Sequence, residues 1–571
     1  MIFLKDTASR INKKVIDERG ALLALFVFLF VYLGVTYIYL RANTAPPKWD
    51  DTDYLINSEI VFKALQGNDV YSSIYYGVKN VNGFYWFSLF SNLMVGRRAP
   101  LIAVLPIPAY FMFGTGSRGL AITFFLLIIC FNLVYYKFVL KLTDGWTAFL
   151  ATAITSTMPL TIGLSRVLFV EYSLMILTVL WVFLQIQSDH FRERRFSIPL
   201  GIVLGLGMLM KVSFPVYIIG PVLWGLISAA KDENPKRRLL NLLGHCMIIL
   251  LTGVVIMSSW YINNIHQVLL YAFDSGFGST SQIYSLGSVF DINTLLNYWI
   301  NVINGGISFY YFVVLLFFLM IAGIKHILHK KRQTSQMVNV AVSTRLPIIL
   351  IWFLVPFIIF SFGVNKDHRF LLPALPALGF IIAQLIMNSF NRRSLSIITI
   401  LLLLIVPCFS FGFTSLPLSA TYTLKIQPFL IVTPNNGFDS RPVSQNWAQY
   451  EILTRIKKDA KKNNIKIDFP IGVIPNYEYF NSLNFMYFSV HYDIPYQFEA
   501  FGPAKDQAEL DAQKERLFRM KYLITKTGTQ GPSFAHNPDF TPLLLQGELP
   551  FVEVARFNLP DGSDGIIFRK K

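Results

Sequence analysis

Long apolar segments recur along the chain and alternate with short polar loops. The first such segment, Ala21 to Leu40, has about the 20 residues that a helix needs to cross the hydrocarbon core of a bilayer. The full set of expected spans is 21–40, 118–140, 147–163, 167–187, 197–211, 213–230, 239–259, 306–325, 346–363, 369–388 and 394–413. Helices satisfy their own backbone hydrogen bonds in lipid, so the pattern predicts an α-helical polytopic membrane protein with about 11 transmembrane helices.

The stretch Pro100 to Gly114 is apolar but does not fit this series. It is short for a span and contains three prolines. Four basic loops also fall on the cytoplasmic side of the membrane only if this stretch does not cross: 190–195, 231–238, 325–345 and 391–393. We therefore expect 41–117 to be one long external loop with two juxtamembrane helices.

The distribution of basic residues predicts the orientation. Lys5, Arg10, Lys13, Lys14 and Arg19 precede the first span, which places the N-terminus in the cytoplasm. An odd number of spans then places the C-terminus outside. The expected organisation is a cytoplasmic segment 1–20, a transmembrane domain 21–413, and an extracytoplasmic domain 414–571.

The C-terminal region changes from apolar spans to alternating helix-like and strand-like segments. Helices are expected at 447–462 and 505–520, and strands at 469–474, 521–525, 551–557 and 565–569. This alternation predicts a small α/β domain. It has no glycine-rich phosphate loop and is not predicted to bind a nucleotide.

Composition agrees with a membrane protein and argues against nucleic acid as a partner. The chain has 571 residues, of which 54% are hydrophobic and 15% charged, with a net charge of +17. Much of the basic charge lies in short loops, where it sets topology and meets anionic lipid. Cys130, Cys246 and Cys408 fall in apolar segments and imply no disulfide framework.

Three carboxylates follow the first span directly. Asp50, Asp51 and Asp53 lie beside Trp49 and Tyr54 at an expected membrane surface. If a helix starts at the preceding prolines, Asp50 and Tyr54 share one face and Asp51 points elsewhere. An acidic first turn favoured by the helix dipole is one interpretation. The other, which we favour, is a general base that takes a proton from an acceptor hydroxyl.

Several cations are expected on the same external face. Arg98 precedes the interfacial stretch, Lys211 lies between two short spans, and His368 and Arg369 begin a later one. Arg98 and Lys211 could instead extend toward lipid headgroups, and His368 could be a neutral structural residue. Positive charge on the outer side runs against the usual bias, which makes Arg369 a candidate for binding a phosphate.

Glu171 begins another span from the outer side. A carboxylate in a span is costly unless it is paired or functional, so Glu171 is either a partner of Arg166 or a second carboxylate of the site. Trp260 and Tyr261 lie at the outer end of a further span, where an interfacial aromatic belt is the simplest interpretation. A sugar linked to a lipid phosphate would use both the carboxylates and the cations.

Five short motifs in this order resemble the GT-C superfamily of integral membrane glycosyltransferases, in particular the bacterial relatives of protein O-mannosyltransferases and of the lipid A aminoarabinose transferase. They are Asp50-Asp51-Thr52-Asp53-Tyr54, Arg98-Ala99-Pro100-Leu101, the glycine-rich segment containing Lys211, Trp260-Tyr261, and Arg369-Phe370-Leu371-Leu372-Pro373. The similarity covers about residues 20–413. The chain departs from the family pattern at Asp51, where Glu is more usual, and at Glu171, where relatives often have Asp.

The resemblance implies a transferase that moves a sugar from a polyprenyl-phosphate donor to a protein, glycan or lipid hydroxyl, with inversion. Asp50 is then the expected catalytic carboxylate, and Arg98, Lys211 and Arg369 are the expected contacts of the donor phosphate. The site would face the outer side of the plasma (inner) membrane. No cofactor is required, although Asp50, Asp51 and Glu171 could hold a divalent cation.

Two other classes remain open at this point. A transporter or flippase of a lipid-linked or anionic substrate would place charges near the membrane midplane and use paired half-helices. The charges here are expected at the outer ends of spans, which favours the enzyme. An external sensor of cell-wall sugar would leave the three carboxylates without a role.

Overall fold

A computed structural model describes residues 2–80, 84–94, 98–230, 235–330, 346–390, 393–419, 422–504, 506–532 and 536–571. Two compact units divide the chain. The helical unit comprises Met1–Tyr39, Met94–Ile102 and Ala121–Pro442. The sheet unit comprises Leu40–Leu93, Ala103–Leu120 and Val443–Lys571. Most of the first long loop therefore folds together with the C-terminal region.

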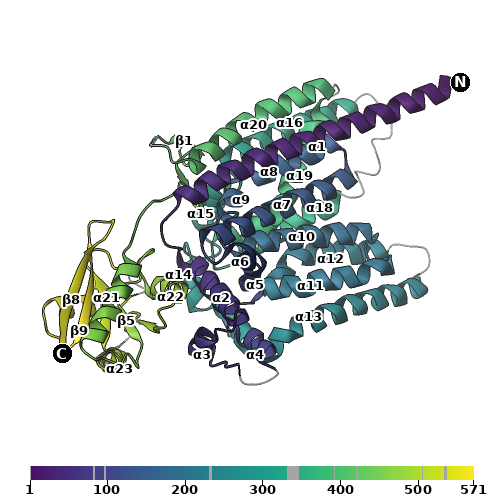
Figure 1. Ribbon diagram of the computed structural model, residues 1–571. Coiled ribbons are helices and arrows are strands. Elements are labelled where there is room, and N and C mark those ends of the chain that lie inside the picture. Colours follow the sequence, from purple (N-terminus) through teal and green to yellow (C-terminus); the bar gives the residue numbers. More distant parts are fainter. Residues whose placement is uncertain are drawn as a thin grey trace. The chain divides into compact units, whose positions relative to one another are not determined.

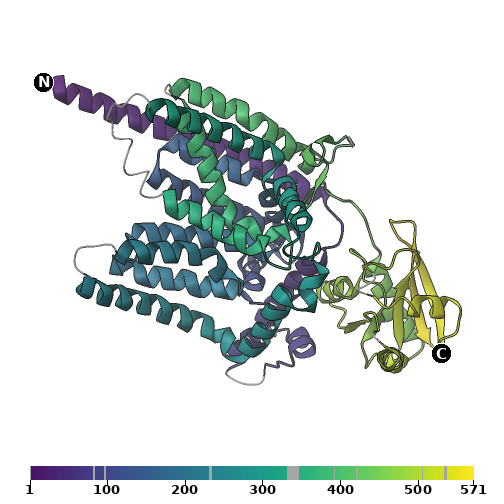
Figure 2. The same cartoon turned by 180° about the vertical axis from the view of Figure 1, so that it is seen from behind.

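The described residues contain seven helices that are long and apolar enough to cross a membrane. They lie in α1 (Ile2–Ala42), α7 (Ser117–Leu142), α10 (Val170–Gln187), α13 (Pro235–Phe277) with α14 (Ser279–Ile283), α16 (Phe309–Lys330), η3 (His368–Ala374) with α19 (Leu375–Ser389), and α20 (Arg393–Ser415). Within the helical unit these helices lie side by side with roughly parallel axes (Figures 1 and 2). The predicted polytopic helical fold is confirmed.

The other expected spans are shorter or broken. They correspond to α8 (Gly145–Ser156) with α9 (Pro159–Leu164), α11 (Ser197–Met210, preceded by η1, Arg194–Phe196), α12 (Phe214–Ala230) and α18 (Leu346–Ser361). The break at 157–158 follows from Pro159, because the residue before a proline avoids the helical region. Met158 is accordingly extended, with φ −67° and ψ 136°. The span predicted at 147–163 is thus two helices.

Helix α13 continues well beyond its predicted end at residue 259. It runs to Phe277 without interruption, and α14 follows. The segment 260–305 lies between two expected spans and contains many glycine, serine and asparagine residues, a composition that is typical of an external loop. It is mostly helical instead, because α13 continues into it and α15 (Ile292–Asn301) and η2 (Val302–Ile307) complete it.

Close packing of α11 on α13 fixes the helix that leads to Lys211. Gly201 and Gly205 lie one turn apart on α11, and this spacing of small residues lets membrane helices approach closely. A Cβ atom at Gly205 would lie 2.6 Å from the Cβ atom of Ile256, and one at Gly201 would lie 2.5 Å from that of Thr252. Neither position has room for a side chain.

The sheet unit is built on a five-stranded mixed sheet of order β6-β5-β7-β9-β8. Its strands are β5 (Ile471–Val473), β6 (Phe498–Ala500), β7 (Tyr522–Lys526), β8 (Phe551–Asn558) and β9 (Asp564–Lys570). Strands β6, β5 and β7 are parallel, while β9 is antiparallel to both β7 and β8. Its C-terminal helices are α21 (Gln449–Lys462), α22 (Ser482–His491), α23 (Gln507–Arg519) and α24 (Phe540–Leu545).

Successive side chains of a strand point to opposite faces of the sheet, and each face carries a hydrophobic cluster. Tyr522, Ile524 and Ile567 belong to one cluster, whereas Leu523 and Ile566 belong to the other. The predicted α/β pattern therefore describes this region well, apart from α22, β6 and α24. Those three elements are short, and the sequence pattern did not separate them from loops.

The first long loop contains more helix than expected. Among its described residues, five helices are found where two were predicted: α2 (Trp49–Leu65), α3 (Val70–Tyr76), α4 (Tyr85–Asn92), α5 (Leu101–Val104) and α6 (Ile107–Phe113). The proline-rich stretch is divided between α5 and α6, and neither could span a bilayer. Phe111, Met112 and Phe113 are 58%, 75% and 47% exposed, as expected of a helix that meets lipid at its surface.

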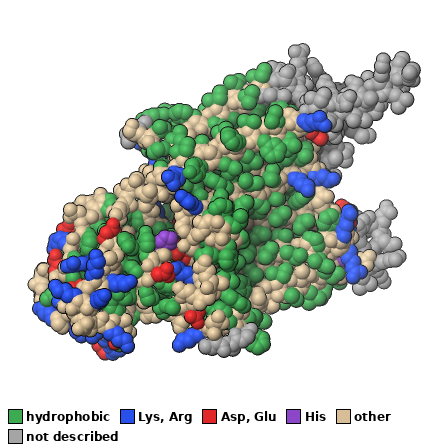
Figure 3. Space-filling view, in the orientation of Figure 1, with side chains coloured by type: hydrophobic (Ala, Val, Ile, Leu, Met, Phe, Trp, Pro, Cys, Tyr) green, Lys and Arg blue, Asp and Glu red, His purple; other side chains and the backbone are tan. Residues whose placement is uncertain are grey.

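Two small hairpins belong to the helical unit, which continues to Pro442 rather than ending near residue 413. They pair β1 (Leu424–Ile426) with β2 (Phe429–Val432), and β3 (Asn435–Asn436) with β4 (Asp439–Ser440). Hydrophobic side chains cover the flank of the long helices, whereas charged side chains gather on the C-terminal region (Figure 3). Arg97 and most of the basic loops, 231–234, 331–345 and 391–392, lie outside the described residues, so the membrane orientation stays a prediction.

Candidate active site

Lys211 lies where the chain leaves α11 and turns into α12. Its backbone is extended, and its N–H donates to the Gly207 carbonyl at 2.9 Å, which closes the last turn of α11. The ammonium Nζ donates to Oε1 of Glu171 at 2.7 Å and lies 4.2 Å from the centre of the Phe370 ring. The side chain keeps 23% of its surface exposed. Lys211 is therefore held in place and still accessible.

Glu171 is the buried centre of this group of charges. It occupies the first turn of α10 and is 1% exposed. Its Oε1 atom accepts from Lys211 and lies 3.8 Å from Nε of Arg369. Its Oε2 atom is buried without a hydrogen-bond partner among the described residues. The geometry makes Glu171 the counter-ion of two cations, with one oxygen left to accept a hydroxyl from water or a ligand.

Arg369 is held between two carboxylates and two aromatic rings. Asp367 accepts from the Arg369 backbone N–H at 3.0 Å and lies 2.9 Å from its Nε. The guanidinium carbon is 5.2 Å from the centre of the Phe169 ring. Lys211, Arg369, Glu171 and Asp367 thus form a cluster of two cations and two anions, which we call the charged cluster. Sequence reasoning had not singled out Asp367, although it stands two residues before Arg369.

His368 packs against the backbone of η2 and an aromatic ring of the β3–β4 hairpin. A Cβ atom at Gly305 would lie 2.8 Å from His368 Nε2, and the Phe438 ring centre is 5.7 Å from the imidazole centre. Nε2 is buried and has no hydrogen-bond partner within the described chain. His368 therefore joins the charged cluster to the β3–β4 hairpin, and its contact with a donor phosphate stays a prediction.

Arg166 does not pair with Glu171, which corrects one of the two sequence interpretations of that carboxylate. It lies 3.6 Å from Asp439 on β4, stacks on the Tyr39 ring at 4.2 Å, and donates to the Ser415 hydroxyl. Both ends of the pair are at most 4% exposed. Burial raises the pKa of Asp439 to about 6, although the charge of Arg166 opposes that rise. The pair fixes the hairpin to the helices.

Three further residues that the sequence singled out, Trp260, Tyr261 and Arg98, also belong to the helical unit. Trp260 and Tyr261 are 0% and 6% exposed on α13, and the Tyr261 hydroxyl donates to the Met208 carbonyl at 3.0 Å. They support the last turn of α11 ahead of Lys211, rather than forming only an exposed aromatic belt. Arg98 is half-buried just ahead of α5. Its place beside a donor phosphate stays a prediction.

Within the sheet unit, α2 displays the expected carboxylates at its first turn. The helix begins at Trp49, after the two prolines, so the prolines precede the helix rather than forming its first turn. Asp50 is half-buried, Asp51 is 8% exposed, and Tyr54 is 4% exposed. Asp53 is contacted by the Asn57 amide at 3.2 Å. Asp50 thus lies in the first turn of α2, near the helix N-terminus.

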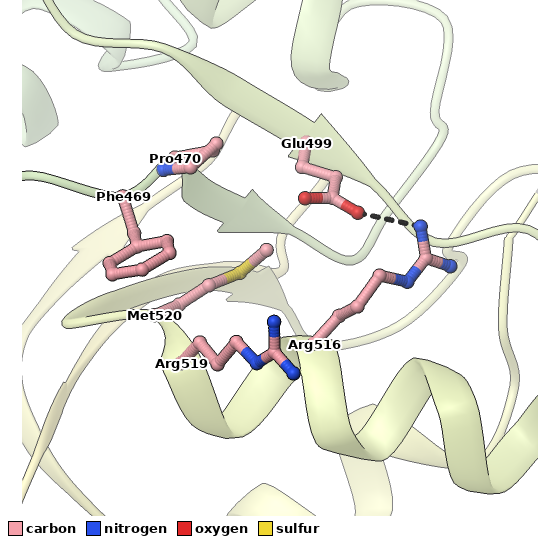
Figure 4. A pocket seen from close by; sticks show the side chains of 6 residues that line it. All are labelled: Phe469, Pro470, Glu499, Arg516, Arg519 and Met520. Carbon is pink, nitrogen blue, oxygen red and sulfur yellow. Dashed lines mark hydrogen bonds and ion pairs between the residues drawn. The ribbon is translucent and has the colours of Figure 1, made fainter.

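No group of three or more metal-binding side chains is found among the residues that the structure describes. Glu171 already serves Lys211 and Arg369, which makes it a poor ligand for a divalent cation. A depression of about 180 Å³ does occur on the C-terminal region, lined by Phe469, Pro470, Glu499, Arg516, Arg519 and Met520 (Figure 4). Arg516 is paired there with Glu499 at 2.9 Å, and none of the predicted site residues lines it.

Comparison with known proteins identifies the fold. No protein-family model and no curated protein sequence matches the chain. ArnT from Cupriavidus metallidurans bound to undecaprenyl phosphate has a TM-score of 0.53 at 12% identity, covering 95% of this chain and 97% of that one. Its apo state gives 0.53 at 13% identity, covering 96% and 98%.

An archaeal protein gives a similar result. The Archaeoglobus fulgidus oligosaccharyltransferase tethered with an acceptor peptide has a TM-score of 0.51 at 12% identity, covering 88% of this chain and 69% of that one. At such identities the likeness concerns the fold alone. The chain therefore has the fold of these proteins, as the resemblance of its sequence motifs predicted.

Proposed function

From the GT-C fold and the charged cluster, we propose that this protein is a glycosyltransferase that uses a polyprenyl-phosphate-linked sugar. The observation that carries the proposal is that Lys211 and Arg369 both approach the same buried oxygen, Oε1 of Glu171. Two fixed cations beside an apolar helix bundle suit the phosphate of a lipid. One of the solved structures with this fold contains undecaprenyl phosphate.

The cations would bind the donor phosphate and stabilise it as a leaving group. An ammonium has three N–H donors and Lys211 uses one on Glu171, while the planar guanidinium of Arg369 suits a phosphate. Negative charge grows on the phosphate as its bond to the sugar breaks. Cations that are already in place stabilise this transition state more than they stabilise the bound donor. Arg98 is proposed as a third contact.

The acceptor would be activated by α2. In the proposed step the acceptor oxygen bonds to the anomeric carbon, the bond from that carbon to the phosphate oxygen breaks, and the phosphate keeps the electron pair. The hydroxyl proton passes to Asp50, the proposed general base. A single displacement of this kind inverts the anomeric carbon. Asp51 and Tyr54 would support Asp50, and no divalent cation is required.

We further propose that the site faces the outer side of the plasma (inner) membrane, with the N-terminus in the cytoplasm. The acceptor is a protein, glycan or lipid hydroxyl. Purified protein in lipid nanodiscs would be given radiolabelled polyprenyl-phosphate sugars, with and without EDTA, and both transfer and hydrolysis measured. Labelled product formed by the wild type supports the proposal. The same protein would be reconstituted in sealed vesicles, where movement of intact donor across the bilayer without any product would indicate a flippase instead.

A further inference from the structure

Helix α2 buries a row of polar groups that lack partners. Thr52, Ser58 and Glu59 on α2, Tyr110 on α6 and Asn484 on α22 are each at most 1% exposed. Each has a side-chain oxygen without a hydrogen-bond partner in the described chain. Buried polar groups left unpaired are costly and usually bind ordered water. We call these five residues the polar seam.

The polar seam connects the first turn of α2 with a point two turns further along. Asp51 and Ser58 are seven residues apart, which places them on one face of the helix about 10 Å apart. Tyr110 lies between these positions, since its hydroxyl neighbours Ser58 and its pKa is raised by burial and by the charges of Glu59 and Asp51. Proton-carrying groups therefore follow the helix from the carboxylate end to Glu59.

At the far end of the polar seam, Glu59 meets a histidine from the C-terminal region. Nδ1 of His491, the last residue of α22, lies 2.8 Å from Oε1 of Glu59. The His491 side chain is 22% exposed, whereas that of Glu59 is 1% exposed. The hydrogen bond to Glu59 raises the pKa of His491. The imidazole thus joins a buried carboxylate to solvent.

Other charged and titratable groups lie beside this imidazole. The Tyr487 ring stacks on it with centres 5.5 Å apart, and the ring of Tyr492 meets its edge at 4.9 Å. Lys63 and Asp493, paired at 2.5 Å, contribute opposite charges from α2 and from the loop after α22. The backbone at Gly116 also lies close to the ring. Among the described residues, Glu59 is the one acid that bonds directly to the ring.

We propose that Glu59 and His491 receive the proton that the α2 carboxylate takes from the acceptor hydroxyl, and release it to solvent. The inference rests on the proposed function. Each turnover leaves one proton on Asp50, the proposed base, which must lose it before the next acceptor can be activated. Asp51, the next residue of α2, is the carboxylate at the start of the polar seam. The proton would move through water held by the polar seam to Glu59 Oε2. His491 releases its proton to solvent and regains one from Glu59, which returns the pair to its starting state.

A purely structural role for the Glu59–His491 pair would not account for the unpaired oxygens of the polar seam. Lys63 and Asp493 already bind α2 to the segment after α22, one turn from Glu59. A further clamp would not require a carboxylate oxygen that is unpaired in the described chain, nor the four other unpaired oxygens of the polar seam. Bridging water among these groups would satisfy both the hydrogen-bond requirement and the proton path.

The test compares His491→Ala, His491→Gln and Glu59→Gln with Asp493→Asn, a control that breaks the neighbouring ion pair and leaves the relay intact. We expect kcat to fall about 10- to 100-fold in the first three, with KM for the donor unchanged. Added imidazole should restore much of the rate of His491→Ala in a concentration-dependent way. The control should keep its kcat.

Loss of activity without imidazole rescue, or an equal loss in Asp493→Asn, would show that the pair is only a clamp and would overturn the relay. An unchanged kcat in His491→Gln would overturn it as well. If the wild type transfers no sugar from any donor, the proposed function itself fails. A working wild type with unaffected variants removes only the relay.

Discussion

The Nζ atom of Lys211 lies 2.7 Å from Oε1 of Glu171, although 40 residues separate them in the chain. This contact brings the end of α11 to the start of α10, and Arg369 approaches the same oxygen. Both cations lie where an α-helix ends or has not yet begun. Lys211 follows the last residue of α11, and Arg369 lies in the 3₁₀ helix η3 ahead of α19.

Removing the Lys211 ammonium should weaken binding of the donor phosphate. A hydrogen bond to a charged group contributes about 1.5–3 kcal/mol. Lys211→Met is therefore expected to raise the Kd for a polyprenyl phosphate about 10- to 100-fold, measured by calorimetry in detergent. Lys137→Met, which removes an exposed lysine from α7, is the matched control. Equal affinity in both variants would argue against the phosphate assignment.

Replacing Glu171 distinguishes a counter-ion from a catalytic carboxylate. Glu171→Gln keeps the size and one acceptor oxygen but removes the negative charge that balances Lys211 and Arg369. We expect phosphate affinity to rise several-fold and kcat to fall less than 100-fold, against the 10²–10⁴-fold typical of a lost general base. Donor binding and single-turnover rates measure both quantities. A loss of rate as large as that of an Asp50 variant would make Glu171 part of the base.

The buried pair of Arg166 and Asp439 should be sensitive to single substitutions and tolerant of a double one. Arg166→Met leaves Asp439 buried without its cation and should lower the free energy of unfolding by about 3–5 kcal/mol. The combined change Arg166→Met and Asp439→Leu removes both charges, and should recover most of that loss. Thermal melting in detergent compares the three proteins. A double variant no more stable than Arg166→Met would contradict this account of the pair.

The Glu59–His491 pair should make stability depend on pH in a defined direction. The folded pKa of His491 is raised above its ordinary value of 6.5. Its contribution is then complete below pH 6.5 and is lost as pH rises through the higher folded value. The melting temperature of His491→Gln should fall below that of the wild type at pH 5.5, and the difference should shrink by pH 9. A difference that grows with pH would show that the pair is wrongly described.

The sequence predicted the helices and strands better than it predicted which side chains pair with each other. The length of the apolar segments located the long helices, and the alternation of helix-like and strand-like segments after residue 440 located most of the sheet. Motifs identified Lys211 and Arg369, because charge at the mouth of an apolar span is unusual. The pairing of Arg166 with Asp439, and of Glu59 with His491, joins residues 273 and 432 positions apart. No local pattern carries that information.

Local propensity also misplaced two boundaries, for different physical reasons. A proline divided the helix predicted at 147–163, because Met158 takes the extended conformation that precedes proline. Conversely, α13 passed its predicted end at residue 259 although polar residues follow it there. Isolated polar residues do not stop a helix unless a cap or a breaker accompanies them.

The central claim, that a carboxylate of α2 activates the acceptor of a lipid-linked sugar, is tested most directly by the turnover of Asp50→Asn. This change keeps the shape of the side chain and removes its ability to accept a proton. Single-turnover transfer from a radiolabelled polyprenyl-phosphate sugar should slow by about 10²–10⁴-fold, while the Kd for the donor stays within about twofold of the wild type. Transfer at nearly the wild-type rate would contradict the account.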